Sequence, residues 1–177
     1  MQKSVRIVGF GGQGIITAGI ILASSAVIEG YNAIQTQAYG SQSRGGASKA
    51  DIIISDEEIY DFVIDYPDYL IALSQVGFDK YKKKIGENTI LLVDSRIKIN
   101  MDELPPHKEL HRYPFVDKGE EIGNIIYAGP VMLGLINRYL GFPKIETIKK
   151  LYEERFPKGK EQNFKAIEAG VTLKEVK

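Results

Sequence analysis

The sequence predicts an α/β fold: one doubly wound domain spanning residues 1–177, with a mostly parallel sheet and a helical C-terminal part. A short strand, a glycine-rich turn and an apolar helical segment follow one another within residues 5–29. Further apolar strands alternate with helical or loop segments up to residue 95, whereas helical periodicity dominates after residue 125. A chain of 177 residues is of ordinary size for one domain with a two-sided core.

The composition narrows the classes of function. Lys plus Arg equals Asp plus Glu at 23 each, so the net charge gives no reason to expect a nucleic acid or a membrane surface as a partner. The chain has no cysteine, which excludes disulfides, thiolate catalysis and cysteine-ligated iron–sulfur clusters. It has no long uninterrupted apolar run and no signal-peptide pattern, so we expect a soluble, cytoplasmic protein.

The glycine-rich turn matches the G-x-G-x-x-G spacing through Gly9, Gly11 and Gly14. In such a turn the glycines allow a sharp bend and a close backbone approach, and the N–H groups at the start of the following helix favour an anion. The alternative is a turn that serves only strand–helix packing. Residues 33–37 contain no carboxylate to hold a ribose, which disfavours a nicotinamide dehydrogenase.

The first half of the chain is expected to alternate strands and helices. The helix at residues 14–29 is apolar nearly all round, so it is either deep in its own fold or covered by another subunit, and Gly30 suits its C-terminal end. The remaining expected elements are a strand at 31–37, a loop at 38–47, a strand at 51–55 with a possible hairpin partner at 59–64, a strand at 69–73, a helix at 75–85 and a strand at 89–93.

The second half is expected to be mainly helical. Residues 110–115 suit an edge strand because Pro114 limits pairing. The segment at 125–140 is apolar on most sides and forms a second candidate contact surface. Amphipathic spacing predicts helices at 144–156 and 160–169, the latter with Phe164 and Ile167 on its inner side.

The residues that could perform chemistry do not form a complete active site. His107 and His111 have the spacing of two metal ligands, but no third ligand is placed beside them, so surface histidines are the default and no metal site is assigned. Asp94, at the end of a strand, is better explained as a turn or helix cap than as an acid. We therefore assign no catalytic residue to this chain.

Arg44 lies in a loop of small residues between Ser43 and the pair Gly45–Gly46. Its planar guanidinium and the neighbouring N–H groups could clamp a phosphate or a carboxylate from a coenzyme or from an acidic side chain of a neighbouring subunit. A surface salt bridge that holds the loop is an equal alternative.

Six segments of the sequence form a recognisable series. In order, they are GFGGQGI at 9–15, YGSQSRGG at 39–46, IISDEEI at 53–59, YPDYLIALS at 66–74, NIIYAGPVMLG at 124–134 and EQNFKAIEAG at 161–170. With these segments the chain resembles the gamma subunit of 2-oxoacid:ferredoxin oxidoreductases, and the pair of glycine loops is the specific part of the pattern. The resemblance covers nearly the whole chain and is greatest to the 2-oxoglutarate type. Phe10 differs from the residue usual in the pyruvate type, and the sequence near Tyr39 differs from that usual in the indolepyruvate type. These differences favour the 2-oxoglutarate or branched-chain types.

The resemblance implies a Rossmann-like subunit of a larger enzyme. Such complexes oxidise 2-oxoacids on thiamine diphosphate with Mg, pass electrons through iron–sulfur clusters to ferredoxin, and transfer the acyl group to coenzyme A. It also implies alpha, beta and delta chains as partners, with the thiamine diphosphate and clusters on those chains. The coenzyme-binding candidates on this chain are Gly11, Gly12, Gln13 and Gly14 in the turn, and Tyr39, Gly40, Arg44, Gly45 and Gly46 in the facing loop.

Three functions stay open, the first of which rests on the resemblance. The chain is a noncatalytic oxidoreductase subunit of the 2-oxoglutarate, pyruvate, 2-ketoisovalerate or indolepyruvate type, a free-standing nucleotide- or coenzyme-binding protein, or an assembly module whose glycine loops bind only protein. The missing catalytic set and the two apolar helices favour the first.

Overall fold

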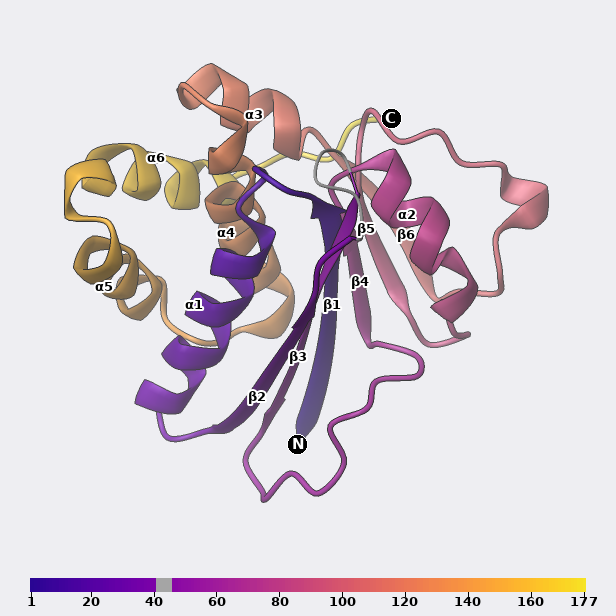
Figure 1. Cartoon of the computed structure of the whole chain (residues 1–177), viewed down its shortest axis with the longest axis horizontal. Helices are drawn as coiled ribbons and strands as arrows, with labels where there is room; N and C mark the ends of the chain where they lie inside the picture. The colour runs from indigo at the N-terminus through magenta and orange to yellow at the C-terminus, as the bar shows by residue number, and fades with distance from the viewer. Residues whose placement is uncertain (41–45) are drawn as a thin grey trace.

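The structure is a computed structural model that describes residues 1–40 and 46–177, and it contains one six-stranded sheet in the order β2-β3-β1-β4-β5-β6 (Figure 1). The strands are β1 (Gln2–Phe10), β2 (Asn32–Ala38), β3 (Ala47–Ser55), β4 (Tyr69–Ala72), β5 (Ile90–Asp94) and β6 (Glu109–Tyr113). The helices are α1 (Ile15–Ile28), α2 (Gln75–Tyr81), α3 (Phe115–Ile122), α4 (Ala128–Leu140), α5 (Ile145–Arg155) and α6 (Lys160–Val171). Four short 3-10 turns join them: η1 (Lys82–Lys84), η2 (Met101–Glu103), η3 (Ile125–Tyr127) and η4 (Pro157–Gly159).

The sheet is mostly parallel, as the sequence predicts. β1, β4, β5 and β6 pair in parallel, whereas β3 pairs antiparallel with both β1 and β2. β3 is therefore the one strand that runs against the others. Its register places Ala47 opposite Phe10 and Ser55 opposite Gln2, so the loop before β3 lies at the carboxyl edge of β1 and the loop after it lies at the opposite edge.

The expected hairpin partner at residues 59–64 is wrong, because these residues form no strand. The antiparallel hairpin joins β2 to β3 instead. Since β2 occupies one edge of β3 and β1 the other, no free edge of β3 remains to which residues 59–64 could add.

Helices cover the two faces of the sheet unequally. α1, α3, α4, α5 and α6 lie on one face, and α2 lies on the other (Figure 1). Alternate strand residues supply the two cores, as in Ile7 toward the five-helix side and Val8 toward α2. The helix expected at 75–85 ends earlier, at Tyr81, and continues as the 3-10 turn η1.

The two apolar helical segments are covered mainly by their own fold. α1 packs against β3, β2, α5 and α4, and Gly30, with φ of 92°, follows its end as expected. The prediction of a second contact surface spans residues 125–140. It is wrong for Ala128–Ile136 of α4, which are all buried in the fold, whereas Ile126 stays exposed. Of the apolar residues in α1, Val27 and Ile28 at its C-terminal end are exposed.

Close glycine contacts explain why α4 is so well covered. A Cβ atom at Gly134 would overlap the carbonyl of Ile167, and one at Gly170 would overlap the carbonyl of Val131. α4 and α6 therefore pack backbone against backbone. Ile167 faces inward as predicted, whereas Phe164 is only half-buried.

The edge strand expected at residues 110–115 is present as β6, but the helix α3 that follows it has no counterpart among the sequence predictions. α3 begins where the buried Asp94 carboxylate accepts hydrogen bonds from the N–H groups of Val116, at 2.9 Å, and Arg96, at 2.9 Å. Burial raises the pKa of Asp94 above its ordinary value. The interpretation of Asp94 as a turn and helix cap is thus confirmed. Across residues 1–40 and 46–177, no helix has the length and apolar content needed to cross a membrane.

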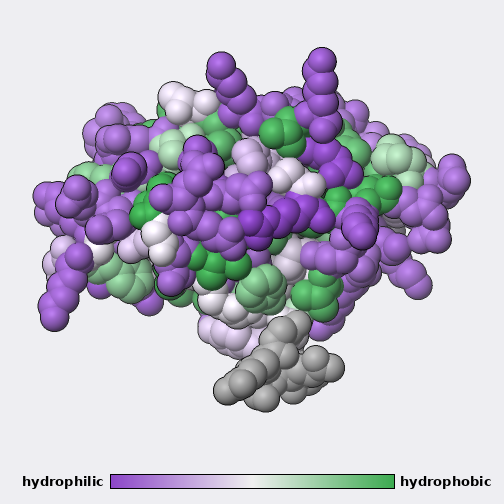
Figure 2. All heavy atoms as spheres, turned by 90° about the horizontal axis from the view of Figure 1, so that it is seen from above, coloured by the Kyte–Doolittle hydropathy of each residue, from purple (hydrophilic) through white to green (hydrophobic). Residues whose placement is uncertain are grey.

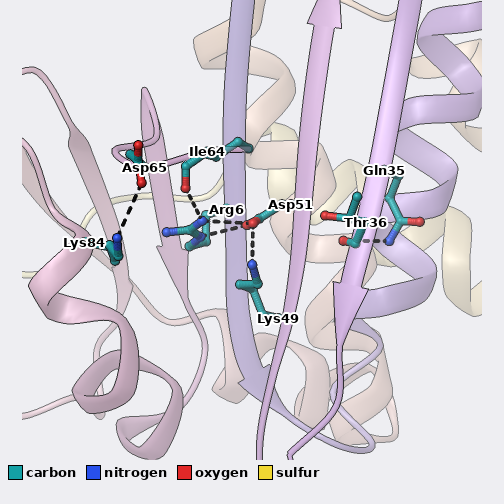
Figure 3. Close-up of polar contacts among 8 residues, drawn as sticks. All are labelled: Arg6, Gln35, Thr36, Lys49, Asp51, Ile64, Asp65 and Lys84. Carbon is teal, nitrogen blue, oxygen red and sulfur yellow. Dashed lines mark hydrogen bonds and ion pairs between the residues drawn. The ribbon is translucent and has the colours of Figure 1, made fainter. Parts of the chain in front are cut away.

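A buried ion pair joins β1 to β3 on the α2 side of the sheet (Figure 3). Arg6 donates to both carboxylate oxygens of Asp51, at 2.7 and 2.9 Å, and both side chains are almost fully buried. Lys49 reaches the same carboxylate at 2.5 Å. Arg6 also donates to the carbonyl oxygen of Ile64 at 2.7 Å, which fixes the long loop between β3 and β4 to the sheet.

We expect Asp51→Asn to lower the free energy of unfolding by about 3 kcal/mol, because Arg6 loses its carboxylate partner while it stays buried. Urea unfolding at neutral pH measures this. Asp65→Asn is the matched control: Asp65 contacts Lys84 at 3.5 Å with both side chains exposed, and we expect a loss below about 1 kcal/mol. Equal effects of the two substitutions would contradict the assigned role of the buried pair.

His111 links β6 to the C-terminal segment through hydrogen-bonding contacts with Glu109 at 2.9 Å and Glu175 at 3.1 Å. Burial of the ring lowers its pKa, but the two carboxylates raise it by more, so the pKa of His111 lies above its ordinary 6.5. A raised pKa gives stability that is complete below the unfolded value and is lost as the pH rises through the folded value.

Accordingly, we expect His111→Gln to destabilise the protein at about pH 5.5 and to have little effect at about pH 9. The difference in unfolding free energy between the two proteins, followed across this range, measures the effect. A destabilisation that grows with pH would have the wrong sign and would refute the role given to the charged imidazole.

Candidate functional site

The glycine-rich turn lies at the carboxyl edge of β1, between Phe10 and the first residue of α1 (Figure 1). Gly12 and Gly14 have φ of 94° and 75°, so both occupy the left-handed region that favours glycine. Gly11 and Gly12 are exposed. No acceptor in the described ranges bonds to the N–H groups of Gly11 or Gly12.

The side chain of Gln13 supports this turn from inside. It is 1% exposed; its Oε1 accepts from the N–H of Phe10 at 3.0 Å and its Nε2 donates to the carbonyl of Leu73 at 2.8 Å. A Cβ atom at Gly9 would lie 2.5 Å from Oε1, which explains that glycine. Gln13 stood among the predicted coenzyme-binding residues, but its side chain is occupied by the protein, so it positions the turn.

The start of α1 presents positive charge without a side-chain cap. Gly14 is the N-cap residue, no side chain bonds to the first N–H groups, and the first turn contains no acidic residue. The helix dipole therefore points its positive end toward the exposed turn. Such a helix start, with adjoining glycine N–H groups, suits a phosphate or carboxylate oxygen.

The predicted facing loop begins and ends beside this turn. Gly40 and Gly46 approach so closely that a Cβ atom at Gly40 would lie 2.6 Å from the carbonyl carbon of Gly46. Since Ala47 pairs with Phe10, this neck of the loop lies at the same sheet edge as the turn. Tyr39 is 66% exposed, and its hydroxyl accepts from Gln37 at 2.8 Å.

Two of the predicted loop residues, Arg44 and Gly45, lie outside the described residues. The structure thus places Gly11, Gly12 and Gly14 at the same end of the strands as Gly40 and Gly46. Figure 2 views the molecule from the end at which β1 finishes, where hydrophobic groups alternate with hydrophilic ones on the surface.

A pocket of about 490 Å³ adjoins the turn and was not predicted. Gly14 and Thr17 form one wall, and the rest comes from η3, α4, α5, η4 and α6. Its lining is mostly apolar, and Tyr152 within it has a buried hydroxyl without a hydrogen-bond partner among the residues described. No short motif could have indicated this pocket, because its walls come from distant parts of the chain.

The ring nitrogens of His107 and His111 contact oxygen atoms of the protein itself. Nδ1 of His107 contacts the carbonyl of Pro105 at 2.9 Å, while His111 lies between Glu109 and Glu175. In the part of the chain that the structure describes, no group of three His, Cys, Asp or Glu residues is arranged to hold a metal ion. What the described part of the site offers is a set of exposed backbone N–H groups, whose chemistry suits an anion.

Comparisons with known proteins agree with this geometry. The family model for Pyruvate ferredoxin/flavodoxin oxidoreductase matches residues 4–173. The 2-oxoglutarate synthase subunit KorC of Methanocaldococcus jannaschii is 41% identical over 174 residues, which cover 96% of this chain and 92% of that protein.

Solved structures give the same result. The gamma subunit of a keto/oxoacid ferredoxin oxidoreductase from Geobacter sulfurreducens matches with a TM-score of 0.80 and 34% identity over 98% of this chain and 99% of that one. A 2-oxoglutarate:ferredoxin oxidoreductase from Magnetococcus marinus, solved with 2-oxoglutarate, coenzyme A and succinyl-CoA bound, shares the fold with a TM-score of 0.84 at 22% identity, over 96% of this chain and 30% of that one. The resemblance inferred from the two glycine loops is confirmed: the chain belongs to the pyruvate ferredoxin/flavodoxin oxidoreductase family.

Proposed function

We propose that residues 1–177 act as one domain, the gamma subunit of a cytoplasmic 2-oxoglutarate:ferredoxin oxidoreductase. The observation that supports this most is the near full-length similarity to a 2-oxoglutarate synthase KorC subunit. In this role the chain assists the oxidative decarboxylation of the 2-oxoacid to an acyl-CoA without a catalytic residue of its own. Pyruvate, 2-ketoisovalerate and indolepyruvate are the alternative substrates, and the experiment below compares them.

The glycine turn is the part of the chain that fits a ligand of this reaction. Coenzyme A has several phosphate groups, and the exposed N–H groups of Gly11 and Gly12 together with the uncapped start of α1 suit one of them. Gly14 and the side chain of Gln13 hold this turn in place. On this proposal, Tyr39, Gly40, Arg44, Gly45 and Gly46 form the opposite side of the contact.

The electron chemistry belongs to other chains on this proposal. Thiamine diphosphate with its Mg and the iron–sulfur clusters lie on the alpha, beta and delta partners, which pass electrons to ferredoxin. The donor set of this chain agrees, because it has no cysteine to ligate a cluster. What the chain supplies is a preformed backbone surface that binds and orients an acyl acceptor.

The first test is reconstitution from separately purified subunits. We expect the isolated chain to reduce no ferredoxin with any 2-oxoacid, and we expect its addition to the thiamine-binding and cluster-binding chains to restore CoA-dependent turnover. The rate of ferredoxin reduction with 2-oxoglutarate, pyruvate, 2-ketoisovalerate and indolepyruvate measures both activity and preference. Turnover by the chain alone would refute the noncatalytic role, and a preference for another 2-oxoacid would refute the 2-oxoglutarate assignment.

The second test adds one methyl group to the turn. A Cβ atom at Gly11 meets no atom within 4 Å, so we expect Gly11→Ala to leave the thermal stability unchanged. If the turn contacts coenzyme A, the methyl group occupies the space of the ligand, and the KM for coenzyme A rises by about tenfold or more. Initial rates of the reconstituted complex at varied coenzyme A concentration measure it.

Gly30→Ala is the matched control for the turn variant. Gly30 also has open space around its Cβ position but has φ of 92°, and it lies at the far end of α1. We expect this variant to lose some stability through backbone strain while its KM for coenzyme A stays at the wild-type value. Arg44→Ala is the second variant on the coenzyme side. If both Gly11→Ala and Arg44→Ala show wild-type coenzyme A kinetics, the coenzyme A contact is rejected, and a role in assembly of the complex is the one that remains.

A further inference from the structure

A second exposed surface lies at the other end of the strands, opposite the glycine turn. Residues 57–66, with the sequence EEIYDFVIDY, belong to the connection between β3 and β4 and form no helix or strand (Figure 1). We call this segment the acidic–aromatic loop. Four of its large side chains are strongly exposed: Tyr60 by 84%, Val63 by 67%, Tyr66 by 63% and Phe62 by 59%.

This exposure is too concentrated to be incidental. Single hydrophobic side chains on a protein surface are ordinary, whereas a contiguous group of large ones indicates an interaction site. Here the four exposed hydrophobic residues fall within seven positions of one segment. Aromatic side chains are also the residues that contribute most to binding at the centres of protein interfaces.

The acidic–aromatic loop is held in shape by contacts to the rest of the chain. The Ile64 side chain is 8% exposed, and its carbonyl accepts from Arg6 at 2.7 Å (Figure 3). At the start of the loop the carbonyl of Glu57 accepts from Asn32 at 3.0 Å, and within it the N–H of Val63 donates to Asp61 at 2.9 Å. A surface that is ordered before binding loses less entropy on association.

Four carboxylates share this segment with the exposed hydrophobic residues. Glu57, Glu58, Asp61 and Asp65 all lie within the loop. Asp65 contacts Lys84 at 3.5 Å, whereas the other three form no ion pair with any residue in the described ranges. Charges around an apolar centre determine which partners are accepted, because like charges repel and opposite charges attract.

We propose that the acidic–aromatic loop docks onto another subunit of the same complex, at an apolar surface bordered by Lys and Arg side chains. This rests on the proposed function, since it requires a multi-subunit enzyme. A second copy of this chain would place carboxylates against carboxylates, and an anionic lipid surface would be repelled in the same way. The chain then meets its complex at two opposite edges: the glycine turn at one, the acidic–aromatic loop at the other.

The test uses the complex reconstituted from purified subunits. Tyr60→Ser with Val63→Ser removes the apolar contact, and Glu57→Lys with Glu58→Lys reverses part of the charge. We expect each double variant to raise the Kd of the chain for the remaining subunits by about tenfold or more. We also expect wild-type binding to weaken with added salt and the charge variant to lose much of that dependence. Binding isotherms at low and high salt measure these effects.

Control variants carry one substitution of each kind, hydrophobic to Ser and Glu to Lys, elsewhere on the surface. Met101→Ser changes a residue that is 58% exposed outside the loop, and Glu154→Lys reverses an exposed charge on α5. Both should bind as the wild type does. Thermal unfolding of every variant shows whether it is folded. The charge variant changes only exposed side chains, so it keeps the test valid if the apolar variant unfolds.

Several outcomes would overturn the proposal. Unchanged Kd values in both loop variants would do so, as would a dimer of the isolated chain that the loop variants abolish. Binding of the loop to vesicles of anionic lipid would have the same effect. The two proposals can fail separately. If the loop variants assemble weakly but Gly11→Ala has unchanged coenzyme A kinetics, only the coenzyme contact is rejected. A wild-type chain that binds no other subunit would reject both.

Discussion

The Arg6–Asp51 ion pair joins β1 to β3. The glycine turn follows β1 and the acidic–aromatic loop follows β3, so the positions of both depend on this pair. The two residues are direct partners in the β1–β3 register. A slip by one residue would turn one strand over, so that Arg6 would face Ala50 or Ile52 and stay buried without a carboxylate. The ion pair therefore favours one register of β3 strongly over its neighbours. Through its further bond to Ile64, the same guanidinium also fixes the acidic–aromatic loop.

The direction of β3 determines where its preceding loop lies. Because β3 is antiparallel to β2, residues between the two strands only need to reverse the chain at one edge. A parallel β3 would need a crossover of a dozen or more residues across a face of the sheet. The hairpin keeps Gly40 and Gly46 at the carboxyl edge of β1, beside the glycine turn. With a parallel β3, Gly40 and Gly46 would lie at opposite ends of the strands, and only one of them could lie beside the turn.

Local signals in the sequence predicted much of this fold. Periodicity and glycine placement predicted α1 and its end at Gly30, the buried strands β4 and β5, and the amphipathic α5. These local signals failed where contacts between residues far apart in the sequence determine the structure. Residues 59–64 have the alternation of a strand, but β3, the strand that precedes them, is already paired on both sides. The internal role of Gln13 depends on the carbonyl of Leu73, 60 positions away, and no local pattern contains such a partner.

Local sequence motifs also predicted only part of the candidate site. The two glycine motifs predicted which segments meet at the sheet edge, because each motif needs only its own backbone conformation. They did not predict that the side chain of Gln13 would be consumed in holding the turn, or that the turn would adjoin an apolar pocket. The turn presents the backbone N–H groups of Gly11 and Gly12 and is supported by the buried amide of Gln13. Backbone N–H groups can hold an anion, but they do not take up or give off a proton at neutral pH. Such a turn suits a subunit that positions a substrate for reactive groups on other chains, because the Gln13 side chain points inward to hold the turn while Gly11 and Gly12 leave its outer side without side chains.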